Sequence, residues 1–489
     1  MAAADATAPS STAKAKVRKP NVLILLFDDL RFDSFSYRGG PVPTPNIDAL
    51  AAQSTRFDLA ISTTGLCSPS RAALFTGRWG HRTGLDDNVE LWHSRLSKLS
   101  DDEGGLLRAA SRNGYRVGYV GKWHLGERGP QIRGAEYVEA FEEEEAARKP
   151  YTPRDSLAAV RRYQAGERDA GGEKHQYYET LAGSYETSFT AEKVHKGQQF
   201  IREVAKEDGP FLAVVSFQQP HPPYRVPEPY ASMFDPDTIK LPANHLAPRV
   251  ATPLSQEYPW WPWHDVGHMT DRDWREARAK YYGAVAMIDR AVGDLIRTAK
   301  EAGLYDDLHI VLLGDQGSMI GEHGLYDKSA YAYDELMRIP LLMRDPDARP
   351  HVVERHVSLI DIPATLFDWM GLVPDKPIDG QSLAGLIDGS AGYKGPDDAL
   401  YAYEWYNGAW FGLRALRTRD HKYVWNPGDA LDELYDLKAD PGETLNLIDS
   451  PRHAATLAGL RQRLLERLRA AEDPAAANLA ALMDRSGKR

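Results

Sequence analysis

The chain has 489 residues, more than one hydrophobic core usually organises, so its length predicts two domains. Its formal net charge of −11 at pH 7 gives no reason to expect nucleic acid or an anionic membrane as a partner, and an anionic substrate would need a local basic pocket. A single cysteine excludes a disulfide within the chain, and no apolar run has the length of a membrane span.

Residues 1–20 are rich in Ala, Ser, Thr and Lys and lack the apolar centre of a signal peptide, so we expect a flexible N-terminal tail. We favour a periplasmic or extracellular location, with the chain beginning after a removed signal peptide. A native extension of a cytoplasmic protein is the alternative.

Four apolar segments predict buried strands of one parallel sheet, namely residues 21–27, 115–120, 211–217 and 309–313. Helical segments lie between them. In residues 275–302 the apolar positions alternate by three and four, and Gly303 is expected to end that helix. Strands alternating with such helices are typical of a largely parallel α/β domain with right-handed crossovers.

Each predicted strand is followed by side chains that bind metals or anions. They are Asp28 and Asp29 after the first strand, Lys122 and His124 after the second, His221 after the third, and Asp315 and Gln316 after the fourth. A single such group is more often a turn or cap residue. Ligands of open α/β sheets gather at the carboxyl ends of the strands, so four in succession favour one common site.

The only cysteine, Cys67, precedes a predicted helix. Ser68 followed by Pro69 predicts the helix start, with the serine as N-cap and the proline at the first helical position. Cys67 is then expected just outside the helix, where free N–H groups and the dipole favour an anion, and Arg71 adds a positive charge. The alternative is a buried cysteine that packs as a small hydrophobe.

Two segments interrupt the α/β pattern. Residues 136–187 are highly charged, and we interpret them as an excursion from the sheet, either a lid or a surface loop. Residues 258–264 are dense in aromatic side chains, including Trp261 and Trp263. Such side chains either stack on sugar rings or pack the loop against the body of the protein.

The pattern changes again after residue 394. Short segments at 400–404, 410–416, 421–425 and 433–437 predict an antiparallel sheet, and residues 454–471 predict an amphipathic helix. We therefore expect an α/β catalytic domain at 21–394 and a small α+β domain at 395–489.

The motifs, in this order, resemble the type I sulfatase family from residue 21 to about 446. The resemblance rests on Asp28-Asp29, Cys67-Ser68-Pro69-Ser70-Arg71 with Thr76-Gly77-Arg78, the Gly-Lys-Trp-His-Leu-Gly block at 121–126, His221 before Pro-Pro-Tyr, Asp315 with Lys328, and residues 433–443. Phe75 and Gln316 depart from the more usual residues. The resemblance implies the alkaline-phosphatase-like α/β sandwich, whose central sheet is mostly parallel and flanked by helices, with a small C-terminal domain.

The resemblance also implies a sulfuric ester hydrolase in which a formylglycine-generating or anaerobic sulfatase-maturing enzyme oxidises Cys67 to formylglycine. It implies the calcium ligands Asp28, Asp29, Asp315 and Gln316, with Arg71, Lys122 and His124 around the formylglycine and His221 and Lys328 on the sulfate. Hard oxygen donors favour calcium, and magnesium less, because several bulky ligands suit the larger calcium shell. We assign His124 to a hydroxyl of the hydrated aldehyde, and His221 to protonation of the leaving alcohol.

The expected substrate is a sulfated small molecule or saccharide. The candidates for binding it are His323, Trp261, Trp263, Trp405 and Trp410. The first alternative is a phosphonate monoester or phosphodiester hydrolase on the same scaffold, because formylglycine in an anion pocket can also act on phosphorus. The second is a non-catalytic carbohydrate-binding relative. The sequence gives no prediction of the oligomeric state.

Overall fold

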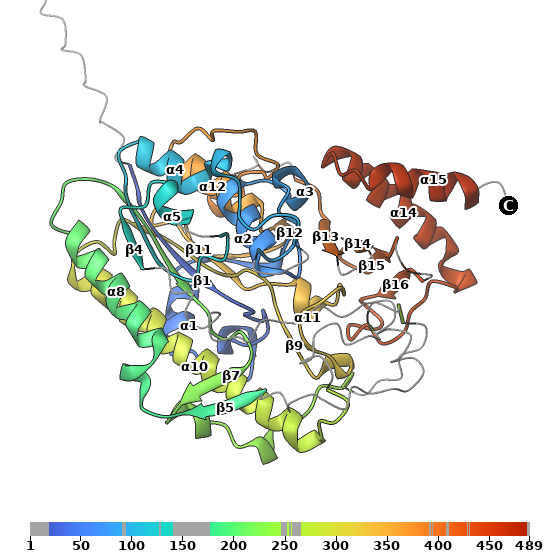
Figure 1. Ribbon diagram of the computed structural model, residues 1–489, viewed down its shortest axis with the longest axis horizontal. Coiled ribbons are helices and arrows are strands. Elements are labelled where there is room, and N and C mark those ends of the chain that lie inside the picture. The colour runs from blue at the N-terminus through green and yellow to red at the C-terminus, as the bar shows by residue number, and fades with distance from the viewer. Residues whose placement is uncertain are drawn as a thin grey trace, which may run out of the picture.

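The protein is a large α/β body with a smaller antiparallel sheet at one side, followed by the C-terminal helices α14 (Ala454–Ala470) and α15 (Ala476–Ser486) (Figure 1). The computed structural model describes residues 19–89, 94–126, 129–139, 177–245, 252–253, 256, 266–390, 393, 395–406, 410–427, 429 and 431–486. No helix in these ranges is both long and apolar enough to cross a lipid bilayer.

The main sheet has eight strands in the order β12-β2-β11-β8-β1-β6-β3-β4, and all except β11 run parallel. They are β1 (Asn21–Phe27), β2 (Thr55–Ile61), β3 (Arg116–Gly121), β4 (Tyr137–Glu139), β6 (Phe211–Phe217), β8 (Leu308–Gly314), β11 (Leu341–Arg344) and β12 (Val352–Ser358). The four predicted strands are therefore confirmed as β1, β3, β6 and β8, and they are neighbours at the centre of the sheet.

Helices cover both faces of this sheet (Figure 1). Every residue of β1 is buried, because alternate side chains enter two different cores. The helices that pack on one face include α2 (Cys67–Thr76), α4 (Gly105–Arg112) and α12 (Asp361–Trp369), and α14 and α15 join the same core. The helices of the other core are α1 (Pro45–Ala51), α8 (Phe189–Val204) and α10 (Asp271–Glu301).

Helix α10 begins at Asp271, four residues before the predicted start at residue 275, because Thr270 and Asp273 form a capping box there. Its C-terminal end is as predicted, with Gly303 in the left-handed conformation at φ +70°. The remaining short elements are α3 (Gly80–Thr83), α5 (Gly129–Ile132), β5 (Tyr178–Leu181), β7 (Tyr224–Pro227), β9 (Met319–Ile320), β10 (Tyr326–Asp327), α11 (Asp334–Met337) and α13 (Ala384–Ile387).

The charged segment 136–187 is not wholly an excursion. Tyr137–Glu139 forms β4 at the edge of the main sheet, because it pairs in parallel with β3. Tyr178–Leu181 pairs with β7. Residues 140–176 and the aromatic segment 258–264 lie outside the described residues, so the predicted lid and the sugar-stacking loop stay predictions.

The C-terminal sheet confirms the predicted change of pattern. Its four antiparallel strands lie in chain order, β13 (Ala399–Tyr406), β14 (Trp410–Arg417), β15 (His421–Trp425) and β16 (Glu433–Asp436). Apolar residues of β13 and β14 pack against Ile61 and Leu66, which lead into α2, and against Ala330 and Ala332. The small sheet thus supports loops of the larger body, while the domain boundary at residue 394 stays a prediction.

Candidate active site

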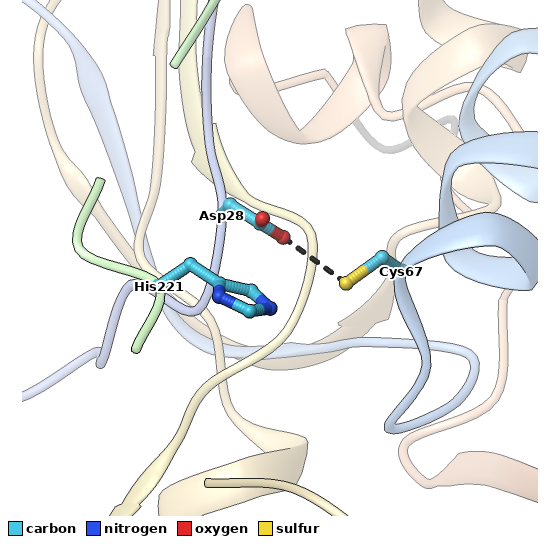
Figure 2. Close-up of side chains that lie close together, drawn as sticks. All are labelled: Asp28, Cys67 and His221. Carbon is cyan, nitrogen blue, oxygen red and sulfur yellow. Dashed lines mark hydrogen bonds between the residues drawn. The ribbon is translucent and has the colours of Figure 1, made fainter. Parts of the chain in front are cut away.

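The four central strands end at one edge of the main sheet. Phe27 of β1 is in register with Gly314 of β8 and Phe217 of β6, and Ser216 of β6 is in register with Gly121 of β3. The residues that follow these strands therefore meet, as the sequence predicts. Figure 2 shows the result for Asp28, His221 and Cys67, whose side chains point toward one another.

Cys67 is the first residue of α2, and its side chain is fully buried. Its sulfur donates to Asp28 Oδ1 at 3.2 Å (Figure 2) and accepts from Gln316 Nε2 at 3.1 Å. The predicted N-cap is wrong, because Leu66 occupies that position and the Ser68 hydroxyl instead donates to the carbonyl of His124 at 2.6 Å. The cysteine thus lies in the first turn of the helix and not before it.

Three fully buried carboxylates, those of Asp28, Asp29 and Asp315, bring oxygens within 4.8 Å of one another. Each also has a cationic side chain within hydrogen-bond distance. Lys122 Nζ lies 2.6 Å from Asp28, Lys328 Nζ lies 2.8 Å from both oxygens of Asp29, and Arg71 Nε lies 2.8 Å from Asp315. Three of the predicted metal ligands and three of the predicted basic residues thus form one cluster of paired acidic and basic groups.

Ionisation of the three carboxyls is unequal. Burial alone would raise the pKa of Asp28, but the positive charges of Lys122, Arg71 and Lys328 outweigh burial and hold that pKa well below its usual range. Burial raises the pKa of Asp29 well above its usual range, and neighbouring carboxylates raise it further, so the charge of Lys328 does not restore it. Burial and the charge of Asp28 likewise raise the pKa of Asp315 to about 7, despite the opposing charge of Arg71. Additional positive charge would therefore favour the fully ionised cluster.

The fourth predicted ligand, Gln316, reaches the same cluster. Its Nε2 donates to Asp29 Oδ1 at 2.5 Å, and the side chain is fully buried. Its Oε1 accepts no hydrogen bond from any residue that the structure describes. A buried oxygen without a donor beside three carboxylates is the arrangement that a hard cation would complete.

The two predicted histidines differ in their surroundings. His221 Nδ1 lies 2.5 Å from the carbonyl of Pro222, and Nε2 lies 3.9 Å from Asp29. Burial and the charge of Lys328 lower the pKa of His221 well below its usual value, so the free protein holds this imidazole neutral. His124 is buried with a φ of 58°, and Asp29 has a φ of 60°. Strained residues of this kind concentrate at functional sites.

Two residues of the site were not predicted. Asp327 is buried, has a φ of 65°, and lies 3.5 Å from Lys328 Nζ. Ser216 accepts a hydrogen bond from Arg71 at 2.8 Å. Ser216 could have been found from the sequence, since it is the one polar residue in the apolar segment 211–217. The sequence marks Asp327 only as the residue before Lys328.

The predicted substrate-binding residues receive less support. His323 is 4% exposed, stacks on Tyr333 with ring centroids 3.9 Å apart, and lies 3.2 Å from Asn244. Its ring is therefore buried against Tyr333 and Asn244. Trp405 and Trp410 lie on paired strands β13 and β14, but their side chains, like Trp261 and Trp263, are outside what the structure describes. Their proposed contact with a sugar stays a prediction.

A parallel α/β sheet with buried carboxylates, basic groups and a candidate nucleophile at its carboxyl edge defines a hydrolase of the alkaline-phosphatase-like superfamily. The sulfatase family model matches residues 20–372, and the model of the N-sulphoglucosamine sulphohydrolase C-terminal region matches residues 321–470. The chain belongs to the type I sulfatase family, so the resemblance found in its motifs is confirmed. It is a sulfatase, a hydrolase of sulfate esters.

The relatives include enzymes named for different substrates. The chain is 27% identical to the ulvan-active sulfatase of Formosa agariphila, over 88% of this chain and 78% of the relative. It is 28% identical to the choline-sulfatase of Rhizobium meliloti, over 91% and 86%. The solved phosphonate monoester hydrolase of Agrobacterium radiobacter is 28% identical, with a TM-score of 0.74 over 92% of this chain and 96% of that one.

Proposed function

We propose that this protein removes sulfate from a carbohydrate sulfate ester, using a formylglycine formed from Cys67 and a bound calcium ion. The observation that supports this most directly is the place of Cys67. Its sulfur lies within hydrogen-bond distance of both Asp28 and Gln316, two of the proposed metal ligands. A group at this position would contact the metal and the sulfate together.

Calcium suits the donor set. The proposed ligands are carboxylate and amide oxygens, with no cysteine cluster and no histidine among them. A half-turn of the Gln316 amide would direct its unused Oε1 toward Asp28 and Asp29, where Nε2 now donates. A bound calcium ion would supply a Lewis acid for a sulfate oxygen. Its two charges and those of Lys122, Lys328 and Arg71 would then exceed the charges of the four nearby aspartates, Asp327 included, which favours an anionic substrate.

Oxidation explains how a thiol position can serve sulfate transfer. Thiolate attack on sulfur would leave a thiosulfate ester without an easy exit. Hydrated formylglycine would offer two hydroxyl groups on one carbon, one to attack sulfur and one whose deprotonation releases sulfate. The conversion would be carried out by a formylglycine-generating or anaerobic sulfatase-maturing enzyme.

The surrounding residues have separate tasks. Lys122 and Lys328 would bind sulfate oxygens from two sides, because they enter from β3 and from the loop after β10. His124 would accept a proton from residue 67. His221 is neutral in the free protein, and the negative charge of a bound sulfate would raise its proton affinity, so that Nε2 could donate to the leaving alcohol.

A second candidate function is phosphonate monoester hydrolysis. It is favoured by the phosphonate monoester hydrolase structure, which is as similar in sequence as the choline-sulfatase, at 28% identity, and is matched over 96% of its length against 86%. The cluster also suits a phosphonate monoester, since both substrates present anionic oxygens to the same cations. The carbohydrate part of the proposal draws on the ulvan-active relative, while the choline-sulfatase relative makes choline sulfate the necessary comparison.

The test is production of the full chain with and without a formylglycine-generating enzyme, followed by peptide mass measurement at position 67. We expect sulfatase activity to rise in proportion to the aldehyde fraction, to fall on chelation and to return with calcium. Activity carried equally by a preparation with only thiol at position 67 would overturn the proposal. Parallel rates on aryl sulfate, phenyl phosphonate, choline sulfate and sulfated saccharides then decide among the substrates.

A further inference from the structure

The turn that follows β1 is held from outside the sheet. Asp29 has a φ of 60°, a conformation that is uncommon for a residue with a side chain. The hydroxyl of Tyr281, on α10, donates to the carbonyl of Asp29 at 3.1 Å and accepts from the backbone N–H of Arg31 at 2.9 Å. One buried phenol therefore closes the turn from Asp29 to Arg31.

The orientation of Asp29 affects most of the site. Its carboxylate binds Lys328 through both oxygens and Gln316 through one, and it lies 3.9 Å from His221. Its backbone N–H donates to Asp315 at 3.2 Å. A change in the Asp29 backbone would therefore disturb a proposed metal ligand and its contacts with four other residues of the site at once.

Tyr281 is itself rigidly placed. It is fully buried, and its ring packs edge-on against Tyr224, which begins β7 just after His221, with centroids 5.3 Å apart. Burial raises the pKa of Tyr281, so the hydroxyl stays protonated and remains a donor. The two hydrogen-bond partners of the hydroxyl are backbone groups of the buried residues Asp29 and Arg31, so water does not take the place of the hydroxyl there.

The same helix also holds the neighbouring loop. Arg278, one turn before Tyr281, donates to the carbonyl of Ile320 at 2.8 Å and pairs with Glu322 at 2.9 Å. Glu322 pairs in turn with Arg31 at 3.0 Å. One face of α10 thus connects the end of β1, which carries Asp29, to the loop beyond β8, which carries Gln316.

We propose that Tyr281 is a positioning residue of the metal site, which holds the Asp29 backbone so that the Asp29 carboxylate faces the cation. This inference rests on the proposed calcium site. It predicts that loss of one oxygen atom on α10 weakens metal binding, although the Tyr281 hydroxyl bonds the backbone of Asp29 and not its carboxylate.

The experiment is a calorimetric calcium titration of the full chain without substrate, so that formylglycine content does not affect the result. Tyr281→Phe is compared with wild type and with Tyr305→Phe. Tyr305 is a buried residue just before β8, at the opposite edge of the sheet, and its hydroxyl donates to Gln53. We expect the calcium dissociation constant to rise about tenfold in Tyr281→Phe, the worth of one buried hydrogen bond, and to change less than about twofold in Tyr305→Phe.

Unfolding in urea separates positioning from general stability. If Tyr281→Phe lowers the midpoint of the calcium-free protein while the calcium dissociation constant stays at the wild-type value, the residue is merely structural and the inference is wrong. If wild type itself binds no calcium, the metal proposal fails instead. Amide hydrogen exchange at Arg31 then tests the turn directly. Exchange accelerated by Tyr281→Phe alone supports the positioning role, and unchanged exchange overturns it.

Discussion

The side-chain nitrogen of Gln316 lies 3.1 Å from the sulfur of Cys67. Gln316 is the proposed metal ligand that differs from the residue usual in the family. It therefore contacts both the proposed metal site and Cys67, the proposed precursor of the nucleophile. Its extra length, compared with asparagine, allows one amide to reach Asp29 and Cys67 together.

Replacing Gln316 should separate these two contacts. Gln316→Asp adds a fourth carboxylate to the cluster, so we expect calcium affinity to rise about tenfold and the calcium-free protein to melt at a lower temperature. We expect kcat to fall, because the donor to residue 67 is lost. Calcium titration and steady-state kinetics measure both effects. Weaker calcium binding in Gln316→Asp than in Gln316→Ala would argue against a ligand at this position.

His221 should matter most when the leaving group is poor. We expect His221→Ala to slow alkyl and sugar sulfates by about 100-fold or more, and activated aryl sulfates by less than about tenfold, since only the former need protonation of the departing oxygen. Comparison of kcat across a series of leaving groups measures the difference. Equal losses on both classes would remove His221 from the role of acid.

Ser68 should affect catalysis through His124. Its hydroxyl donates to the His124 carbonyl at 2.6 Å and so holds a turn with a φ of 58°. We expect Ser68→Ala to lower kcat about tenfold with little change in KM. Because Ser68 lies beside Cys67, rates must be divided by the aldehyde fraction measured by mass. Ser54→Ala, which removes a buried hydroxyl bonded to the Leu50 carbonyl, is the matched control and should leave kcat at the wild-type value.

Lys422 should be essential for stability. Its Nζ is fully buried and lies 2.8 Å from Asp334, 2.7 Å from Glu443 and 2.7 Å from the carbonyl of Ala332. Lys422→Met leaves two buried carboxylates without this partner, so we expect a loss of roughly 3–5 kcal/mol in unfolding free energy. The exposed Lys438→Met should change it by less than about 0.5 kcal/mol. A urea midpoint shared by both variants would refute this role.

Asp361 should make stability depend on pH. Burial raises the pKa of Asp361 to about 6. The backbone N–H groups of Gln381 and Ser358 donate to its carboxylate and lower the pKa, but burial has the larger effect. The unfolded chain ionises first, near pH 4, so the stabilising contribution is complete below pH 4 and is lost as pH rises through about 6. We expect wild type to lose roughly 2–3 kcal/mol relative to Asp361→Asn between pH 4 and pH 7.

Urea unfolding at several pH values measures this difference. Asp368→Asn, which changes an exposed aspartate on the same helix, is the control and should run parallel to wild type. A constant gap between wild type and Asp361→Asn across this range would mean that the carboxyl of Asp361 is ionised throughout.

The fold could be predicted largely from local pattern. The apolar runs of β1 and β6 begin and end at the predicted residues, because strands buried on both faces exclude polar side chains along their whole length. The helix start near Cys67 was predicted, but its cap was not. Ser68 has a competing partner 56 positions away in His124, and no local rule contains that contact.

The sequence by itself determined which residues stand at the strand ends, and hence that carboxylates, histidines and basic groups would share one edge of the sheet. Only the tertiary structure decided how they pair. Asp28 and Asp29 are adjacent in the chain, yet one binds Lys122 and the other Lys328, because the left-handed turn at Asp29 directs the two carboxylates to different cations. That turn depends on Tyr281, a residue 252 positions further along the chain. Spacing in the sequence cannot indicate such a contact, since it exists only when α10 packs across the sheet.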